Sequence, residues 1–139
     1  MAIDRIRKHK IIKVIFDTSI LLTPFEFSIN IDFELEKLLG SFEILIPTCV
    51  IEELKTLSEK TTGKKKRNAN AALKLVEKYK TIECKHREPD KALIEIAKKL
   101  PKAIVATNDT ELIQKLRSRN IPVIYLRGKN RFVLEGELR

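Results

Sequence analysis

Short apolar runs alternate along the chain with longer segments in which apolar residues recur at helical spacing. The runs at 14–16, 42–46, 103–106 and 123–126 show no polar alternation, which is typical of strands buried on both faces of a parallel sheet. Because strands and amphipathic helices alternate, the connections should be right-handed crossovers. The pattern predicts an α/β fold: a central parallel twisted sheet of about four to five strands with helices on both faces.

Capping residues, glycines and prolines place the ends of the predicted helices. The first helix is expected over 19–25 and should stop at Thr23-Pro24, because proline disfavours helix in the residue before it. Asn30 is expected to cap the next helix, which Gly40 ends. The remaining expectations are helices over 31–39, 48–60, 68–80, 91–100 and 110–119, a short strand over 81–84, and an edge strand or extended arm at 131–134.

The size and composition of the chain fit one domain. With 139 residues, 43% of them hydrophobic, it can bury a single core, and no apolar run approaches the ~18 residues of a membrane span. The basic start is followed by too few apolar residues for a signal peptide. We therefore expect a basic N-terminal lead-in at 1–12, one folded domain at 13–139, and a cytoplasmic location without membrane contact.

The charge balance is strongly basic. The 28 Lys and Arg residues exceed the 19 Asp and Glu residues, and the net charge of +9 favours nucleic acid as a partner. A like-charge block stands between two predicted helices, and such blocks are usually only solvated. Here the block and a lysine in the next helix are the candidates for binding an RNA backbone: Lys64, Lys65, Lys66, Arg67 and Lys74.

The two cysteines, Cys49 and Cys84, are isolated in the sequence. They form no C-x-x-C pair, and His9 and His86 also stand alone, so no zinc-ligand spacing is present. We expect two small buried or half-buried thiols rather than a zinc site or a disulfide. The glycine-rich motifs of nucleotide-binding folds are also absent from the sequence.

Four carboxylates draw attention by their positions. Asp17 and Asp109 each follow a predicted strand, and Asp90 begins a helix. In open α/β sheets, ligands bind at the carboxyl ends of the strands. Helix phase adds Glu53: at about 100° per residue it lies at the margin of its helix's apolar stripe, whereas Glu52 lies nearly opposite. Glu53 should therefore lean over the sheet edge, and Glu52 should face water.

Each of these carboxylates also has a purely structural interpretation, which is the better one for any of them taken alone. The three aspartates could cap helices or begin turns, and Asn108 with Glu111 three residues later resembles a capping box. Glu53 could pair with a surface lysine at little energetic consequence. Four carboxylates at one sheet edge would repel one another, however, unless a cation sat among them. Mg²⁺ or Mn²⁺, which prefer oxygen ligands, would fit best.

Four segments follow one another in a characteristic order: Ile15-Phe16-Asp17-Thr18-Ser19, Pro47-Thr48-Cys49-Val50-Ile51-Glu52-Glu53-Leu54, Asp90-Lys91-Ala92-Leu93-Ile94-Glu95-Ile96-Ala97 and Ile104-Val105-Ala106-Thr107-Asn108-Asp109. Together they resemble the successive signatures of the PIN-domain ribonucleases over nearly the whole chain. Within that family, the segments at 107–112, 121–126 and 132–135 resemble the branch involved in ribosomal-RNA processing. VapC-type toxins are the less similar branch.

The resemblance implies a PIN-like domain and a metal-dependent endoribonuclease that uses Mg²⁺ or Mn²⁺. It implies that the catalytic, metal-binding residues are Asp17, Glu53, Asp90 and Asp109. Ser19 and Thr107 are implied to orient these carboxylates, and Asn108 also fits the family pattern. The favoured branch often carries paired aspartates where this chain has Asp90 followed by Lys91, so the number of metal ions stays open.

We therefore expect hydrolysis of RNA phosphodiester bonds, with a ribosomal-RNA precursor as substrate. A homodimer or ribosome-assembly proteins are further expected partners. Two alternatives stay open: a catalytically inactive PIN-like RNA-binding scaffold and a VapC-type toxin ribonuclease. A phosphoacceptor receiver domain would need an acidic pair after the first strand, and a haloacid-dehalogenase phosphatase would need an aspartate where Ser19 stands. Both are disfavoured.

Overall fold

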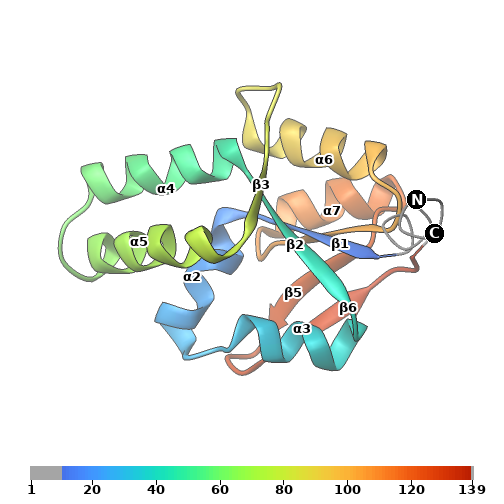
Figure 1. Cartoon of the computed structure of the whole chain (residues 1–139), viewed down its shortest axis with the longest axis horizontal. Coiled ribbons are helices and arrows are strands. Elements are labelled where there is room, and N and C mark those ends of the chain that lie inside the picture. Colours follow the sequence, from blue (N-terminus) through green and yellow to red (C-terminus); the bar gives the residue numbers. More distant parts are fainter. Residues whose placement is uncertain (1–10, 139) are drawn as a thin grey trace, which may run out of the picture.

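A six-stranded sheet forms the centre of the computed structural model, which describes residues 11–138 (Figure 1). The strands are β1 (Ile12–Phe16), β2 (Phe42–Pro47), β3 (Lys80–Ile82), β4 (Ala103–Ala106), β5 (Val123–Arg127) and β6 (Arg131–Glu135). Their order is β3-β2-β1-β4-β5-β6, with β1 to β5 parallel and β6 antiparallel to β5. The predicted α/β architecture is confirmed, with six strands instead of four to five because the C-terminal segment pairs with β5.

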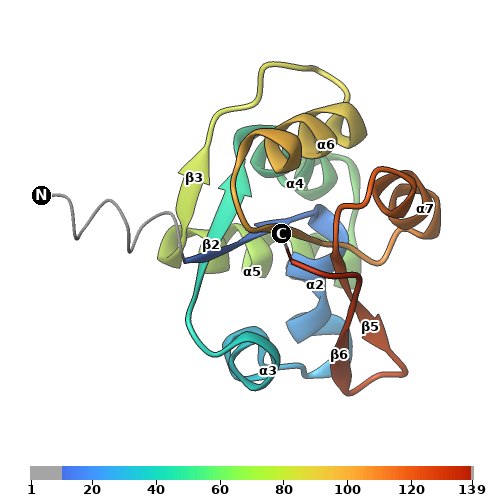
Figure 2. The same ribbon diagram turned by 90° about the vertical axis from the view of Figure 1, so that its right-hand side faces the viewer.

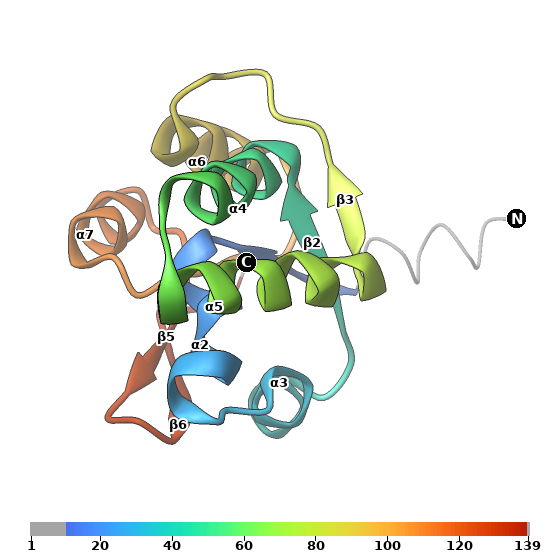
Figure 3. The same cartoon turned by 90° about the vertical axis from the view of Figure 1, so that its left-hand side faces the viewer.

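Helices cover both faces of this sheet. They are α2 (Thr18–Phe27), α3 (Ile31–Leu39), α4 (Thr48–Lys60), α5 (Gly63–Leu75), α6 (Pro89–Lys99) and α7 (Thr110–Ser118), with a 3₁₀ turn η1 (Val76–Lys78). Alternate residues of β1 serve opposite cores: Val14 and Phe16 pack with α2 to α5, and Ile15 packs with α6 and α7. Figure 2 shows α7 on one side of the sheet, and Figure 3 shows α5 in front of the other.

The predicted N-terminal lead-in lies largely outside the described part of the chain. Residues 1–10 of the predicted basic lead-in lie outside the described residues, and β1 begins at Ile12, one residue earlier than the predicted domain start. Among residues 11–138, no helix combines the length and apolar character needed to cross a bilayer.

The helix α2 continues through Pro24, so its predicted end at Thr23 is wrong. Proline has no backbone N–H to donate to the carbonyl of Ile20, four residues earlier. The buried hydroxyl of Thr23 donates to that carbonyl instead, at 2.6 Å. The helix therefore ends only at Phe27, and the next residue, Ser28, adopts a left-handed conformation with φ 56°.

The basic block lies inside a helix rather than ahead of one. Helix α5 begins at Gly63, five residues before the predicted start at 68, and so includes Lys64 to Arg67. Lysine and arginine are good helix formers, and these side chains are exposed, so no burial cost opposes the helix. The four cations are therefore displayed on a rigid surface.

Cys49 and Cys84 form a disulfide, so the prediction of two free thiols is wrong. The strand register explains the pairing. Pro47 of β2 lies beside Ile82 of β3 in the parallel sheet, and each cysteine comes two residues after its strand partner. Their Cα atoms are 5.9 Å apart, within the usual range for a disulfide. A separation of 35 residues hides this proximity from local sequence patterns.

Candidate active site

Asp17 stands at the carboxyl end of β1 and is only 9% exposed. In the parallel register Phe16 pairs with Ala106, so the residues that follow, Asp17 and Thr107, are neighbours. The hydroxyls of Thr107 and Ser19 both donate to the same carboxylate oxygen, Oδ2 of Asp17, at 2.7 and 3.1 Å. Two hydroxyl donors thus hold a nearly buried carboxylate in one orientation.

The same hydroxyls hold the turn between β4 and α7. Ser19 Oγ accepts a hydrogen bond from the Asn108 N–H at 2.9 Å, and Thr107 Oγ1 accepts one from the Asp109 N–H at 3.1 Å. Asn108 Oδ1 accepts from the N–H of Leu126 at 2.8 Å, which links the turn to β5. The capping interpretation of Asn108 is therefore wrong.

Asp109 is the residue that caps α7. Its Oδ1 accepts hydrogen bonds from the N–H groups of Glu111 and Leu112, at 3.0 and 3.4 Å. The structural interpretation of this aspartate therefore holds for one of its oxygens. The residue itself is exposed at the sheet edge, three positions after β4.

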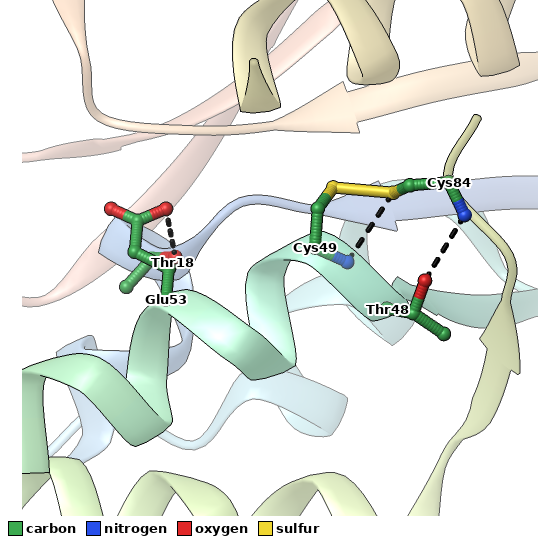
Figure 4. The surroundings of a disulfide bond; sticks show 5 residues. All are labelled: Thr18, Thr48, Cys49, Glu53 and Cys84. Atoms are coloured by element: carbon green, nitrogen blue, oxygen red, sulfur yellow. Dashed lines mark hydrogen bonds between the residues drawn. A yellow bond between two sulfur atoms is a disulfide. The ribbon is translucent and has the colours of Figure 1, made fainter. Parts of the chain in front are cut away.

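Glu53 is hydrogen-bonded to the start of α2, whereas Glu52 pairs with a lysine on its own helix. The hydroxyl of Thr18 donates to Oε2 of Glu53 at 3.0 Å, as Figure 4 shows. The side chain of Glu52 is 73% exposed and lies 3.5 Å from Lys55. Burial raises the pKa of Glu53, the Thr18 hydrogen bond opposes this rise, and the charges of Asp17 and Asp90 add to it.

Asp90 lies in the first turn of α6 and faces α7. Its Oδ2 is 3.7 Å from Nζ of Lys115, which is also 3.6 Å from Glu111. Burial, followed by the charge of Asp109, raises the pKa of Asp90, and Lys115 lowers it; the charges of Asp17 and Glu111 raise it further. Lys91, next in sequence, pairs instead with Glu88 at 3.4 Å. Among the described residues, the cation paired with Asp90 is Lys115.

In each of the four carboxylates, one of the two oxygens has a partner within the chain. Each has one oxygen held by the chain: Oδ2 of Asp17 and of Asp90, Oε2 of Glu53, and Oδ1 of Asp109. Among the described residues, their second oxygens have no hydrogen bond or ion pair. The side chains sense one another's charge, but within residues 11–138 no three Asp, Glu, His or Cys residues are gathered closely enough to hold a metal ion.

Sequence reasoning missed two contributors to this site. The sequence offered a signal for Thr18, because it stands between Asp17 and Ser19 in the same hydroxyl-rich segment. Lys115 had a weaker signal: it follows Glu111 by four residues and therefore shares a helix face with it. Its partner Asp90 is on another helix, which the sequence alone does not place.

The predicted RNA-binding residues lie on a separate part of the molecule. Lys64, Lys65, Lys66, Arg67 and Lys74 are exposed on α5. Figure 1 shows α4 and α5 as a helical hairpin whose connecting turn, next to the basic block, projects to the left of the sheet. Within the described chain, none of the five side chains is held by an ion pair. Their positive charge is therefore available to an external anion.

Comparison with known proteins identifies the family. A family model described as a PIN like domain matches residues 14–129, so the chain belongs to the PIN-domain family. The chain is 39% identical over 127 residues to ribonuclease VapC4 of Methanocaldococcus jannaschii, covering 89% of this chain and 97% of that protein. It is 36% identical over 135 residues to ribonuclease VapC9 of Archaeoglobus fulgidus, covering 97% and 98%.

Solved structures agree on the fold. The structure of the PIN domain endonuclease Utp24 superimposes with a TM-score of 0.75 at 23% identity, over 91% of this chain and 92% of that one. A domain of a functionally unknown protein from M. jannaschii gives a TM-score of 0.61 at 19% identity, over 91% and 96%. At these identities, the likeness extends to the fold alone.

Proposed function

We propose that this protein is a metal-dependent endoribonuclease that hydrolyses phosphodiester bonds of RNA. The observation that carries the proposal is the set of four carboxylates at the carboxyl edge of the sheet, each with one oxygen held by the chain and one open. The charges of Asp17 and Asp90 act on Glu53, and those of Asp109 and Asp17 act on Asp90, so this edge brings negative charges near one another. The names of the two curated relatives, both ribonucleases, support the same conclusion.

The chemistry of the donor set suits a hard divalent cation, and because the described carboxylates are not gathered closely enough to hold one, the side chains would have to draw together around it. Carboxylate oxygens are the ligands that Mg²⁺ and Mn²⁺ prefer, and burial together with neighbouring negative charge raises the pKa of Glu53 and Asp90. In our proposal, Asp17, Glu53, Asp90 and Asp109 hold this cation. When bound, one such cation would lower the pKa of the attacking water, and a second, if present, would stabilise the departing 3′ oxygen. The chain's own part is placement: Thr107 and Ser19 fix Asp17, and Thr18 fixes Glu53.

Two settings for this activity are compatible with the chain. The curated relatives named VapC, at 36% and 39% identity, favour a VapC-type ribonuclease at least as strongly as one that processes a ribosomal-RNA precursor. We expect a cytoplasmic enzyme in either setting. A VapC-type enzyme should arrest growth when expressed alone, and Asp17→Asn should relieve the arrest. A processing enzyme should instead cut a precursor ribosomal RNA at defined positions in preference to mature RNA.

The experiment that tests the activity compares the wild type with Asp17→Asn on single-stranded and structured RNA. We expect cleavage in Mn²⁺ or Mg²⁺ that the substitution lowers by about 100-fold or more, since removal of one electrostatic group from such a site typically has that effect. RNA binding should persist in the variant. Glu52→Gln removes the charge of the neighbouring residue on α4, which pairs with Lys55 and not with Thr18. It is the matched control and should cleave normally. If the wild type is as inert as the variant with every metal and substrate, the RNA-binding scaffold becomes the better description.

The basic residues of α5 are proposed to bind the RNA backbone. Lys65→Glu combined with Lys66→Glu should weaken RNA binding and reduce the slope of log affinity against log salt by about 1 to 2, because fewer counterions are released. Lys98→Glu with Lys129→Glu changes the net charge equally from exposed positions on α6 and the β5–β6 turn. An unchanged salt slope in the first double variant would remove α5 from the interface.

A further inference from the structure

The disulfide joins the two segments that carry Glu53 and Asp90. Cys49 lies in the first turn of α4, and Glu53 follows one turn later, as Figure 4 shows. Cys84 lies in the connection between β3 and α6, six residues before Asp90. The bond therefore links the backbone beneath one candidate metal ligand to the backbone that leads into another.

Two hydrogen bonds also join this connection to α4 among the described residues. The Cys84 N–H donates to Oγ1 of Thr48 at 3.0 Å, and the Cys49 N–H donates to Sγ of Cys84 at 3.3 Å. Residues 83–88 form no helix or strand, and positions 85–88 are exposed. The disulfide is a covalent link between the two segments, in addition to these hydrogen bonds, to the β2–β3 pairing that ends at Pro47 and Ile82, and to the contacts between α4 and α6.

The two cysteine residues border a groove at the surface. Cys49 and Cys84 are both half-buried, and they line a groove of about 400 Å³ between α4 and the 83–88 connection. Glu53, Arg87 and Pro89 line the same groove. A thiol reagent that enters the groove would therefore meet the disulfide beside the candidate active site.

We propose that the Cys49–Cys84 disulfide is a redox-controlled tether that sets the position of Asp90 relative to Glu53, and with it the affinity for a divalent cation. This inference rests on the metal-dependent function proposed above. Reduction by a dithiol protein begins when its thiolate attacks one sulfur, which forms a mixed disulfide and releases the other sulfur as a thiolate. The second thiol of the reductant then attacks the mixed disulfide and releases the cysteine sulfur that was attacked first. Two electrons pass to the chain, which gains two thiols, and the reductant becomes a disulfide.

The distinction from an ordinary structural disulfide lies in what reduction changes. Disulfides of cytoplasmic proteins are usually catalytic or redox-sensing, whereas those of heat-adapted archaeal proteins are often structural. A structural bond would affect the temperature of unfolding but leave the folded site unaltered. A tether would affect cation binding in protein that is still folded.

The test measures Mn²⁺ binding by calorimetry on the full chain, oxidised and after treatment with dithiothreitol, at a temperature where circular dichroism shows both to be folded. Reduction should weaken Mn²⁺ affinity about tenfold, in the range seen when groups that orient metal ligands are removed. Hydrogen exchange should accelerate in residues 83–90, and reoxidation should restore both properties. The Cys49→Ser, Cys84→Ser double variant should behave as the reduced protein and ignore dithiothreitol.

Equal Mn²⁺ affinity and equal exchange in folded oxidised and reduced protein would overturn the tether and leave a structural disulfide. Should the double variant fail to fold, the reduced wild type still decides the question. Failure of the proposed function is distinguishable, because it would appear as absent RNA cleavage in the oxidised protein or as Mn²⁺ binding that Asp17→Asn leaves unaltered. RNA cleavage should follow Mn²⁺ affinity through the same redox cycle.

Discussion

The inner and outer halves of the candidate site are built in different ways. In the inner half, Asp17 and Thr107 come from the ends of two adjacent parallel strands and are buried, and Ser19 joins them from the first turn of α2. The outer carboxylates, Glu53, Asp90 and Asp109, lie on helices or at a helix start, and two of the three are exposed. The backbone ladder fixes the first half, whereas each outer carboxylate is oriented by one or two side-chain or capping contacts.

This difference suggests that the two halves have different roles. A carboxylate held by two hydroxyls in a buried position is pre-organised and costs little to align. The outer carboxylates can move toward or away from a cation, because their partners are a single threonine, a half-exposed lysine and a helix cap. Substitutions in the inner half should therefore affect both stability and activity, and those in the outer half mainly the activity.

Thr107→Val should have the largest effect on this comparison. The variant keeps the shape of a fully buried side chain but removes the 2.7 Å hydrogen bond to Asp17 and the acceptor for the Asp109 N–H. We expect the free energy of unfolding to fall by about 2 kcal/mol and cleavage to fall by about 30-fold. Thr23→Val is the matched control, since it removes a hydroxyl as buried as that of Thr107 from α2. It should lose stability without weakening Mn²⁺ binding.

Thr18→Val should have a smaller effect, confined to the outer half. It removes the hydrogen bond that opposes the raised pKa of Glu53, so the pKa of Glu53 should rise further. Cleavage at neutral pH should fall by about fivefold, as expected for one neutral donor, and the activity profile should shift to higher pH. Cleavage rates measured across pH test this, with the exposed Thr56→Val as control. A uniform loss at every pH would mean that Thr18 acts through packing alone.

The sequence predicts the inner half better than the outer half for the same physical reason. Buried parallel strands are recognisable as apolar runs, and their carboxyl ends meet at one edge, so Asp17 of the inner half could be expected near the segment that follows β4. Helix phase also separates Glu53 from Glu52, because a regular helix fixes the direction of each side chain.

Contacts between separate helices and strands could not be predicted from local sequence patterns. The disulfide depends on which strands are neighbours, and Lys115 meets Asp90 only because α6 and α7 share one face of the sheet. The continuation of α2 through Pro24 depends on one hydroxyl that replaces the missing donor. In each case the structure depends on a side chain whose position in space cannot be read from the sequence.

The smallest expected effect concerns stability against pH in metal-free buffer. Burial and neighbouring carboxylates raise the pKa of Glu53 above its ordinary value of 4.5. Below pH 4.5 this group is protonated in both folded and unfolded protein and costs nothing; as the pH rises through the folded pKa, the folded state must hold an unfavourable charge and loses stability. Glu53→Gln should therefore melt at a higher temperature than the wild type at pH 7, and at the same temperature below pH 4.5.

Mn²⁺ should reverse this order at pH 7, because a cation that binds the folded state stabilises the protein that binds it more tightly. Melting curves of the wild type and Glu53→Gln, with and without Mn²⁺, measure both effects. Glu52→Gln removes the same charge from a side chain that is 73% exposed and should respond alike in all conditions. If Mn²⁺ stabilised wild type and Glu53→Gln equally, Glu53 would be an ordinary surface carboxylate, and the outer half of the site would shrink to Asp90 and Asp109.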